Sequence, residues 1–493
     1  MIYNFNLGIG WASSGVEYAQ IYRARMFRNI GVDAKFVFTD MFPSENMEHM
    51  TKNIGFLDSE VIWLYTFFTD FKTAPVTYTL SDLEKTFTDL NYTKTREGKI
   101  CRYVFGGSNN FYTAYMVNDH DDFVHRVELV SNGFLIRKDY FTYGRVYSEY
   151  YAPLDNKAHL YHRRFFNENG SVAYEEIIDD DRVMYKFKDN ILCSKEEFVG
   201  YMVSQLHLTK DDVVLIDRST DIGQSILMNC KPARVGTVVH ADHFSEKDTN
   251  DDYILWNNFY EYEFNMHKHI DFYICSTQAQ SDLMVQQFEK YYGITPCVYT
   301  IPVGSLPELK YPKENRKPFS LITASRLASE KHVDWICKAV IQARSEVPEV
   351  SLDIYGVGGE REKLETIIRE NHAQDYIHLM GQHDLSEVYQ NYEAYIAGST
   401  SEGFGLTLME AVGGGLPIIG FDVRYGNPTF IRNGENGYLI SLPEEDKDKI
   451  EALRKGIVDL FKQDLEKCHS VSYEVAKDFL TCNVQEKWRE AVC

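Results

Sequence analysis

Short apolar runs alternate with helical patterns at both ends of this chain, and this alternation constrains the fold more than any other feature. Residues 3–10 and 35–39 have the composition of strands, and residues 16–30 between them carry apolar side chains at spacings of three and four. Residues 61–66 indicate a further strand. Strands that alternate with helices predict βαβ units built on a parallel sheet.

The same pattern returns after residue 194. Strands are expected over residues 213–217, 234–239, 272–275, 298–301, 319–324, 351–355, 377–380, 394–397 and 417–421. Four prolines lie between residues 302 and 318, in a polar stretch typical of a linker. The sequence therefore predicts two α/β domains joined by this linker, with a deep cleft between them.

Residues 75–200 have a different texture. Eleven tyrosines lie between residues 101 and 190, many in β-type runs. The dipeptides Asn132-Gly133 and Asn169-Gly170 are typical of tight hairpins, because both central residues accept a positive φ. We expect an antiparallel meander inserted into the first α/β domain. It is either an ordinary surface subdomain or a platform whose exposed aromatic face meets another chain.

The charge balance excludes one class of function. Lys and Arg number 51 against 73 Asp and Glu, which gives a net charge of −22 over 493 residues. Such an acidic surface repels phosphate backbones and anionic lipid at long range, which argues against a nucleic-acid-binding protein. A nucleotide ligand remains compatible, because a few local cations and backbone amides suffice to bind it.

Cysteine usage and hydropathy indicate the cellular compartment in which the protein is expected. The nine cysteines include no CxxC pair, so zinc-binding and thioredoxin-like motifs are absent, and a reducing compartment is expected. The sequence has neither a signal-peptide pattern at its start nor about 18 consecutive apolar residues. These features predict a cytoplasmic protein.

Two motifs follow strands and could contact an anion. Residues 8–15 form a glycine-rich turn before the first helix, which is equally compatible with a structural turn and with a phosphate or sugar contact. Arg326 and Lys331 lie in a strand-to-helix loop, where two cations can converge on one diphosphate. Two solvated surface charges are the alternative.

The segment 401–411 carries the strongest signal. A strand leads into a glycine-containing turn, and a helix is expected to open near Leu406. Glu402 lies before this helix and Glu410 about one turn inside it. A helix N-terminus offers free amides to a phosphate, whereas carboxylates bind neutral hydroxyls. The pattern therefore predicts a ligand that combines a phosphate with a sugar and a ribose.

His240 follows the strand 234–239, at the strand end where ligands of open α/β sheets bind. His243 lies three residues later, and a pair of histidines raises the question of a metal. No third ligand accompanies them at a suitable spacing, so no metal site is expected. The run Asp179–Asp181 is interpreted as a solvated loop.

Taken together, Glu402 and Glu410, Arg326 with Lys331, and the glycine loop resemble a retaining glycosyltransferase of family 4. Residues 7–19, 240–243, 402–410 and 422–427 more closely resemble the A subunits of the accessory-secretion glycosyltransferases. The resemblance covers nearly the full length, with one departure: residues 413–415 are three consecutive glycines.

The resemblance implies an α/β GT-B fold, with two Rossmann-like domains facing a cleft and an inserted antiparallel β-sheet domain. Residues 1–74 and 201–308 would form the acceptor-side domain, and residues 309–493 the UDP-sugar-binding domain. Residues 75–200 would be the inserted domain, which binds the acceptor or a partner.

Individual roles also come from the resemblance. The implied catalytic residues are Arg326, Lys331, Glu402 and His240. The implied contacts to the donor nucleotide are Gly15, Val16, Glu17, Tyr18, Gln382, His383, Leu406, Thr407 and Glu410. The implied contacts to the donor sugar are His240, Glu402, Gly403, Phe404 and Gly405.

The implied reaction is transfer of N-acetylglucosamine from UDP-GlcNAc to Ser or Thr of a serine-rich repeat adhesin before its export by the accessory secretion system. No cofactor and no metal are expected. UDP-glucose as the donor, a non-catalytic acceptor-binding subunit and a carbohydrate-directed transferase are the alternatives. Because a silent subunit would be free to lose Arg326, Lys331 or Glu402, their presence favours an enzyme.

The resemblance further implies a B subunit that binds the acceptor, self-association to a tetramer, or both. It implies no nucleic-acid partner and at most peripheral contact with the inner face of the membrane.

Overall fold

The structure is a computed structural model that describes residues 1–9, 15–43, 45–87, 91–106, 109–155 and 157–493. The chain forms two compact units, and each is described by itself. The first comprises residues 1–24, 32–238 and 256–271, and the second comprises residues 25–31, 239–255 and 272–493. The domain limits expected at residues 74, 200 and 308 stay predictions.

The first unit contains parallel strands in the order β15-β14-β1-β2-β3. These strands are β1 (Ile2–Asn6), β2 (Ala34–Phe38), β3 (Val61–Trp63), β14 (Val213–Ile216) and β15 (Arg234–Val239). The helices are α1 (Gly15–Ile30), whose last turns belong to the second unit, α2 (Met47–Ile54), α3 (Leu64–Phe67), α4 (Leu80–Lys85), α5 (Lys195–Gln205), α6 (Gly223–Asn229) and α7 (Glu261–Asn265).

The strand predicted over residues 61–66 is half wrong. It ends at Trp63, and Leu64–Phe67 form the single helical turn α3. The Thr66 hydroxyl donates to the Trp63 carbonyl at 3.3 Å, which closes this turn. Leu64 and Tyr65 are both buried, and the periodicity of so short an apolar run does not separate a buried strand from a buried helical turn.

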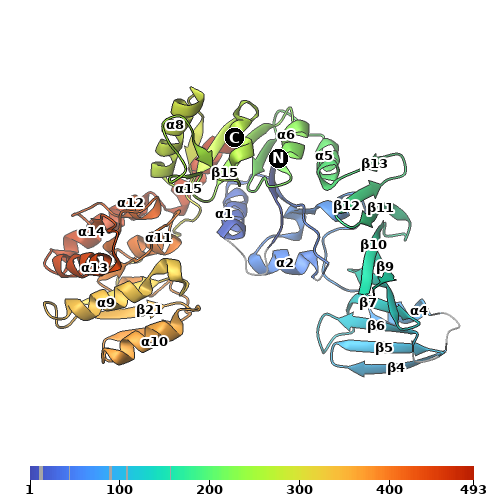
Figure 1. The fold of residues 1–493 in the computed structure, drawn as a ribbon, viewed down its shortest axis with the longest axis horizontal. Coiled ribbons are helices and arrows are strands. Elements are labelled where there is room, and N and C mark those ends of the chain that lie inside the picture. The colour runs from blue at the N-terminus through green and yellow to red at the C-terminus, as the bar shows by residue number, and fades with distance from the viewer. Residues whose placement is uncertain (10–14, 44, 88–90, 107–108, 156) are drawn as a thin grey trace. The chain divides into compact units, whose positions relative to one another are not determined.

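The insertion is a ten-stranded antiparallel sheet in which the strands β4 to β13 follow one another in chain order (Figure 1). The strands are β4 (Tyr92–Glu97), β5 (Ile100–Phe105), β6 (Phe111–Met116), β7 (Val124–Ser131), β8 (Phe134–Phe141), β9 (Arg145–Leu154), β10 (Lys157–Phe166), β11 (Val172–Asp179), β12 (Arg182–Lys186) and β13 (Ile191–Leu192). Asn132 and Gly133, with φ values of 50° and 82°, close the predicted hairpin between β7 and β8.

The insertion buries some of its tyrosines and exposes others, so the expected exposed aromatic face is wrong in part. Five of its tyrosines are buried, namely Tyr103, Tyr140, Tyr147, Tyr174 and Tyr185. Tyr174 stacks on Phe165 with ring centroids 4.5 Å apart and contacts Phe198 of α5 at 5.4 Å. Alternation along a strand places every second residue on the core side, and these five tyrosines lie on that side.

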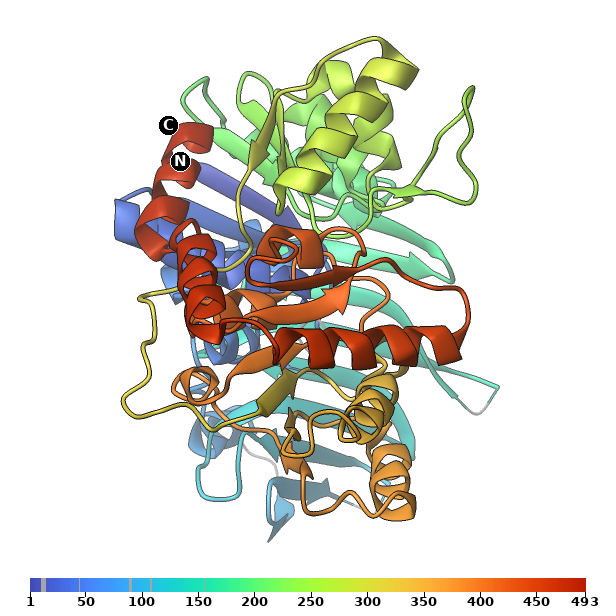
Figure 2. The same ribbon diagram turned by 90° about the vertical axis from the view of Figure 1, so that its left-hand side faces the viewer.

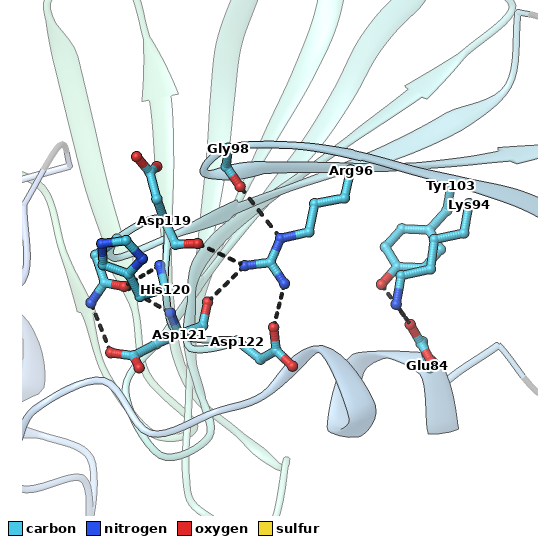
Figure 3. A network of polar contacts seen from close by, with 10 residues as sticks. Glu84, Lys94, Arg96, Gly98, Tyr103, Asp119, His120, Asp121 and Asp122 are labelled. Atoms are coloured by element: carbon cyan, nitrogen blue, oxygen red, sulfur yellow. Dashed lines mark hydrogen bonds and ion pairs between the residues drawn. The ribbon is translucent and has the colours of Figure 1, made fainter.

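Polar contacts connect the β4 end of the insertion to its neighbours (Figure 3). The Arg96 guanidinium donates to the carboxylate of Asp122 at 2.5 Å and to the carbonyl of Asp121 at 3.1 Å. Glu84 of α4 accepts from Lys94 at 2.7 Å and from Tyr103 at 2.8 Å. These bonds hold α4 and the loop 117–122 against the first two strands of the sheet.

The second unit contains a six-stranded sheet in the order β22-β21-β20-β23-β24-β25, parallel throughout. Its strands are β20 (Ser320–Ala324), β21 (Ser351–Tyr355), β22 (Ile377–Gly381), β23 (Ala394–Ile396), β24 (Ile418–Phe421) and β25 (Gly437–Ile440). The main helices are α8 (Gln278–Tyr292), α9 (Val333–Ala343), α10 (Arg361–Glu370), α11 (Leu406–Gly413), α12 (Gly426–Phe430), α13 (Asp446–Leu460), α14 (Leu465–Lys477) and α15 (Thr481–Val492). A further parallel pair is β18 (Phe272–Cys275) with β19 (Val298–Thr300).

Successive residues of β20 belong to different cores. Leu321 lies in the cluster formed with α9, α10 and α13, whereas Ile322 lies in the cluster formed with α11 and α14. Strand alternation therefore buries both faces of this sheet, as in other doubly wound α/β folds. Figure 2, turned by 90° from Figure 1, shows helices along the strands of this unit.

The predicted linker also belongs to the second unit. Leu306 pairs with Leu480 through a short parallel bridge, in which the Leu306 amide donates to the Phe479 carbonyl at 2.8 Å. The Thr481 amide donates back to the Leu306 carbonyl at 2.9 Å. Among the described residues, no helix has the length and apolar character needed to cross a membrane.

Candidate active site

Lys331 and Glu402 form an ion pair at the carboxyl ends of the strands of the second unit. Lys331 ends a 3-10 turn (Ser329–Lys331) between β20 and α9, and its ammonium donates to Oε2 of Glu402 at 2.6 Å. Both side chains keep about a fifth of their surface exposed, 19% and 20%. The pair is thus accessible to a ligand, and the site holds one positive and one negative charge side by side.

Glycine at position 398 lets the Lys331 turn approach β23. A Cβ at this position would lie 2.8 Å from the His332 carbonyl and 3.0 Å from the Lys331 carbonyl. A side chain at this position would therefore require the backbone of the Lys331 turn to shift. The backbone around Lys331 is therefore seated directly on the chain that leaves β23 toward Glu402.

Arg326 lies in the same loop but has a different partner. Its side chain is 77% exposed, and Nη2 donates to Oε1 of Glu330 at 2.9 Å. An exposed pair of this kind contributes little to stability, about 0–1 kcal/mol. Each of the two cations predicted to converge on one diphosphate therefore has its own carboxylate partner in the structure.

The backbone of Glu402 is fixed by a short parallel bridge to Tyr425. The Glu402 amide donates to the Arg424 carbonyl at 3.1 Å, and the Glu402 carbonyl accepts from Tyr425 at 2.5 Å and from Gly426 at 2.7 Å. A Cβ at residue 426 would lie 2.3 Å from the Phe404 carbonyl, so only glycine permits this approach.

Helix α11 begins where the sequence predicts, at Leu406. Its N-cap is Gly405, with a φ of 89°, a left-handed conformation that favours glycine. The amides of Leu406 and Thr407 lie in the first turn, where helix geometry supplies no intrahelical acceptor. The Thr407 hydroxyl is 3.0 Å from that of Tyr395, which also donates to the Ala324 carbonyl at 2.9 Å. Burial raises the pKa of Tyr395 to about 12, so this hydroxyl keeps its proton.

Glu410 lies one turn inside α11, as predicted, and is largely enclosed. Its Oε2 accepts a hydrogen bond from the Tyr389 hydroxyl at 3.0 Å. Burial raises the pKa of the Glu410 carboxyl above its ordinary value, and the bond from Tyr389 opposes that shift.

Phe404 and Gly403 of the predicted sugar loop have different surroundings. Phe404 is buried and packs edge-on against Phe430, with centroids 5.3 Å apart, so its ring serves the core. Gly403 lies beside His240, because a Cβ at residue 403 would be 3.8 Å from the His240 carbonyl oxygen. The structure therefore brings His240 to the loop that carries Glu402 through backbone proximity.

Gln382 and His383 follow β22, and both are exposed. Nε2 of His383 is 2.8 Å from the Met380 carbonyl, and the ring meets Tyr355 edge-on at 5.8 Å. These contacts hold the imidazole against its own loop beyond the end of the sheet.

Gly15, Val16, Glu17 and Tyr18 form the first turn of α1 in the first unit, and residues 10–14 of the glycine loop lie outside the described residues. Val16 and Glu17 are buried, whereas Tyr18 is half exposed. One turn further, Arg23 forms a buried ion pair with Asp217 at 2.7 Å, which fixes α1 against the end of β14.

Sequence reasoning did not find the tyrosines that support this site. Tyr389 holds Glu410, Tyr395 holds Thr407, and Tyr425 holds Glu402. Tyr425 also lies 3.3 Å from Nδ1 of the buried His243. Two of them had a signal, since Tyr395 lies in a predicted strand next to the motif and Tyr425 lies in the segment 422–427 that carries the resemblance. Within the described part of the chain, no group of three or more His, Cys, Asp or Glu could hold a metal ion.

Known protein families match two parts of the chain. The GtfA extended beta-sheet domain family matches residues 93–189, and the family of glycosyl transferases group 1 matches residues 308–478. The chain is 52% identical over 492 residues to the UDP-N-acetylglucosamine–peptide N-acetylglucosaminyltransferase GtfA subunit of Streptococcus agalactiae, which covers 99% of this chain and 97% of the relative.

Two solved structures are similar over the whole chain. A crystal structure of a GtfA/B complex superposes with a TM-score of 0.96 at 52% identity, covering 100% of this chain and 99% of that one. The pneumococcal O-GlcNAc transferase GtfA, solved in complex with UDP and GlcNAc, has a TM-score of 0.85 at 49% identity and coverage of 100% and 98%. The predicted GT-B fold class with an inserted antiparallel sheet is confirmed. The chain belongs to the GtfA subunit family of glycosyltransferases.

Proposed function

We propose that this chain is a retaining glycosyltransferase that transfers N-acetylglucosamine from UDP-GlcNAc to Ser or Thr hydroxyls of a protein. Relatives at about half identity over the full length carry the name of this activity, and one was solved with UDP and GlcNAc. The observation that carries the proposal is the placement of Lys331 and Glu402 before the N-terminus of α11, with Glu410 one turn inside it.

The leaving group sets the main chemical demand. When the bond between the anomeric carbon and the phosphate oxygen breaks, the electron pair stays on UDP and positive charge develops on the sugar. Lys331, Arg326 and the amides of Leu406 and Thr407 would stabilise the diphosphate as its charge grows. For this, Lys331 and Arg326 would have to exchange their carboxylate partners for phosphate oxygens.

The carboxylates would bind the neutral parts of the donor. Glu402, with the backbone of Gly403 and Gly405 and with His240 nearby, would accept hydrogen bonds from sugar hydroxyls. Glu410 would accept from the ribose, since its carboxylate lies one turn behind the phosphate-binding amides.

Two further groups of residues would complete the donor site. Gln382 and His383 would contact the uracil from beyond β22. Gly15 to Tyr18 of the first unit would face the diphosphate.

Retention of configuration would follow from attack on the same face that UDP leaves. The serine oxygen forms its bond to the anomeric carbon as the phosphate bond breaks, and the departing phosphate takes the serine proton. No protein nucleophile enters this scheme. No metal and no cofactor enter it either, because Lys331, Arg326 and the helix amides supply the positive charge.

The acceptor and the assembly are also part of the proposal. The acceptor would be a serine-rich repeat adhesin, glycosylated in the cytoplasm before export, with at most peripheral contact of the enzyme with the membrane. A related structure is a GtfA/B complex, which supports a partner subunit for this chain. Self-association of this chain to a tetramer, together with the B subunit or in its place, is a further element of the proposal.

The decisive experiment combines donor hydrolysis and transfer. The purified chain, alone and with its B subunit, is given UDP-GlcNAc, UDP-GalNAc, UDP-glucose and UDP-galactose, with an adhesin repeat as acceptor. Radiolabelled N-acetylglucosamine on the repeat, with UDP-GlcNAc turned over fastest, is expected. If UDP-glucose is turned over fastest, the donor is UDP-glucose instead. If the complex shows no hydrolysis and no transfer, the chain is a non-catalytic subunit.

A further inference from the structure

Helix α11 ends on three consecutive glycines, and each is in contact with a different element. A Cβ at residue 413 would lie 2.9 Å from the Leu306 side chain of the linker. A Cβ at residue 414 would lie 2.8 Å from the Cβ of Tyr389, and one at residue 415 would lie 2.4 Å from the Tyr473 ring. No methyl group can be added at the first two positions unless the neighbouring residue moves, and position 415 also has a φ of 78°.

Arg316 of the linker joins two of these elements. Its partly buried guanidinium donates to the carbonyl of Gln390, within the 3-10 turn Tyr389–Asn391, at 2.9 Å and to that of Tyr392, directly after this turn, at 2.8 Å. It also donates to the Gly414 carbonyl at 2.9 Å. The turn that carries Tyr389 is thus bonded through one side chain to the C-terminal end of α11.

Helix geometry places these contacts around Gly414 next to Glu410. Glu410 and Gly414 are four residues apart in and directly after α11, so they lie on one side of the helix, one turn apart. The backbone of Tyr389 is packed on Gly414, and its ring reaches back by that turn, so that its hydroxyl meets Oε2 of Glu410 at 3.0 Å. Tyr389 is 4% exposed, so the ring that makes this bond is enclosed by the protein.

We propose that Tyr389 is a positioning residue for Glu410, held in place by Gly414 and Arg316, and that it sets the affinity of the enzyme for the ribose of the donor. This inference rests on the proposed role of Glu410 as the ribose ligand. With Oε2 engaged by the tyrosine, the carboxylate is held in one orientation, and Oε1 is directed to the ribose hydroxyls. The run of three glycines at residues 413–415, which departs from the family pattern, thereby has a structural role at residue 414.

The test compares two nucleotides that differ only in the ribose hydroxyls, UDP and 2′,3′-dideoxy-UDP, whose binding to the whole enzyme is measured by calorimetry. In Tyr389→Phe, the Kd for UDP should rise about tenfold, the effect of one lost bond to a charged group, and the Kd for dideoxy-UDP should not change. The KM for UDP-GlcNAc should rise with it, and kcat should stay within about twofold. Gly414→Ala, which displaces Tyr389 without removing its hydroxyl, should act in the same direction.

Tyr392→Phe is the matched control. Tyr392 is equally buried and directly follows the same 3-10 turn, but its hydroxyl donates to Asp353 at 2.6 Å, away from Glu410. This variant should keep the wild-type preference for UDP over dideoxy-UDP, although it loses a buried hydrogen bond of the same kind. Melting temperatures of all variants show that the comparison is made on folded protein.

Glu410→Ala distinguishes a wrong ribose assignment for Glu410 from a wrong role for Tyr389. It should bind UDP no better than dideoxy-UDP. If it keeps the full preference for UDP, the ribose assignment is wrong and the inference is lost with it. If Glu410→Ala loses the preference while Tyr389→Phe keeps it, or weakens both nucleotides equally, the role of Tyr389 alone is overturned.

Discussion

The Lys331 ammonium lies 2.6 Å from Oε2 of Glu402, so the cation proposed for the diphosphate and the acid proposed for the sugar form one ion pair. The two residues are 71 positions apart, and Gly398 lets the backbone at Lys331 approach the chain that leads from β23 to Glu402. A donor that binds here must insert a phosphate beside the lysine and a hydroxyl beside the glutamate. The site is therefore charge-balanced before the donor enters.

Lys331→Ala should lower the rate of transfer at least about a hundredfold, as loss of one preorganised charge at a developing anion does. Stability should change little, because the side chain is partly exposed in a loop. Lys338→Ala is the control, since Lys338 pairs with Asp334 from the adjoining helix α9 at 3.6 Å. A radiolabelled-donor assay in which both variants transfer at nearly the wild-type rate would remove Lys331 from the diphosphate site.

Arg326→Ala should also lower transfer about a hundredfold, although its side chain is 77% exposed and pairs with the surface residue Glu330. The matched control is Arg361→Ala, because Arg361 forms the same kind of exposed pair, with Glu365 at 2.8 Å. Equal activity of the two variants would mean that the Arg326–Glu330 pair is an ordinary surface ion pair.

Transfer should continue at its full rate in excess EDTA. The positive charge that stabilises UDP comes from Lys331, Arg326 and the amides at the start of α11, and none of these requires a divalent ion. The measurement is the rate of GlcNAc transfer before and after chelation, and after addition of Mn²⁺ or Mg²⁺. Loss of activity in EDTA with specific recovery in Mn²⁺ would contradict the proposed mechanism.

Stability should fall on acidification because of His243. Its imidazole is buried, with Nε2 2.7 Å from Oε1 of Gln287, and burial lowers its pKa from 6.5 to about 4. Between these values the unfolded chain binds the proton and the folded chain does not. The contribution, about 3 kcal/mol at most, is therefore present above pH 6.5 and lost as the pH falls toward 4.

His243→Asn tests this because the replacement does not titrate. From pH 7.5 to pH 5, its melting temperature should fall less than that of the wild type, and His120→Asn, at an exposed histidine, should follow the wild type. Identical losses in all three proteins would place the acid sensitivity elsewhere.

Local patterns predicted most strands and the start of α11, because strand composition and the glycine turn before Leu406 are local signals. The pairing of Lys331 with Glu402 could not be predicted, since it depends on packing between residues far apart in sequence. Tyr389 was missed because it lies in a short 3-10 turn, which has no periodic sequence pattern. Counting tyrosines also could not tell which face of each inserted strand is buried, so the burial of Tyr174 was not predicted.

The expected role of the insertion in binding the acceptor or a partner is best tested by surface substitutions and not by deleting the insertion. Phe165, Tyr174 and Tyr185 belong to the same core as Phe198 and Val199, so removal of the sheet would open the core of the first unit. A surface on the opposite face is available instead. Tyr150, His162, Ile177 and Met184 lie opposite one another across β9 to β12 and so share a face.

Replacement of Ile177 and Met184 together by Glu should lower transfer to the adhesin repeat and weaken binding of the B subunit, each by about tenfold. Both side chains are exposed, 40% and 38%, beside the stacked rings of Tyr150 and His162, and such a row of apolar groups is suited to contact with another chain. Hydrolysis of UDP-GlcNAc should persist, because Lys331 and Glu402 are unchanged. Leu57→Glu, at a leucine 49% exposed outside the insertion, controls for the added charge. Full glycosylation and normal complex formation by the double variant would show that this face binds neither partner.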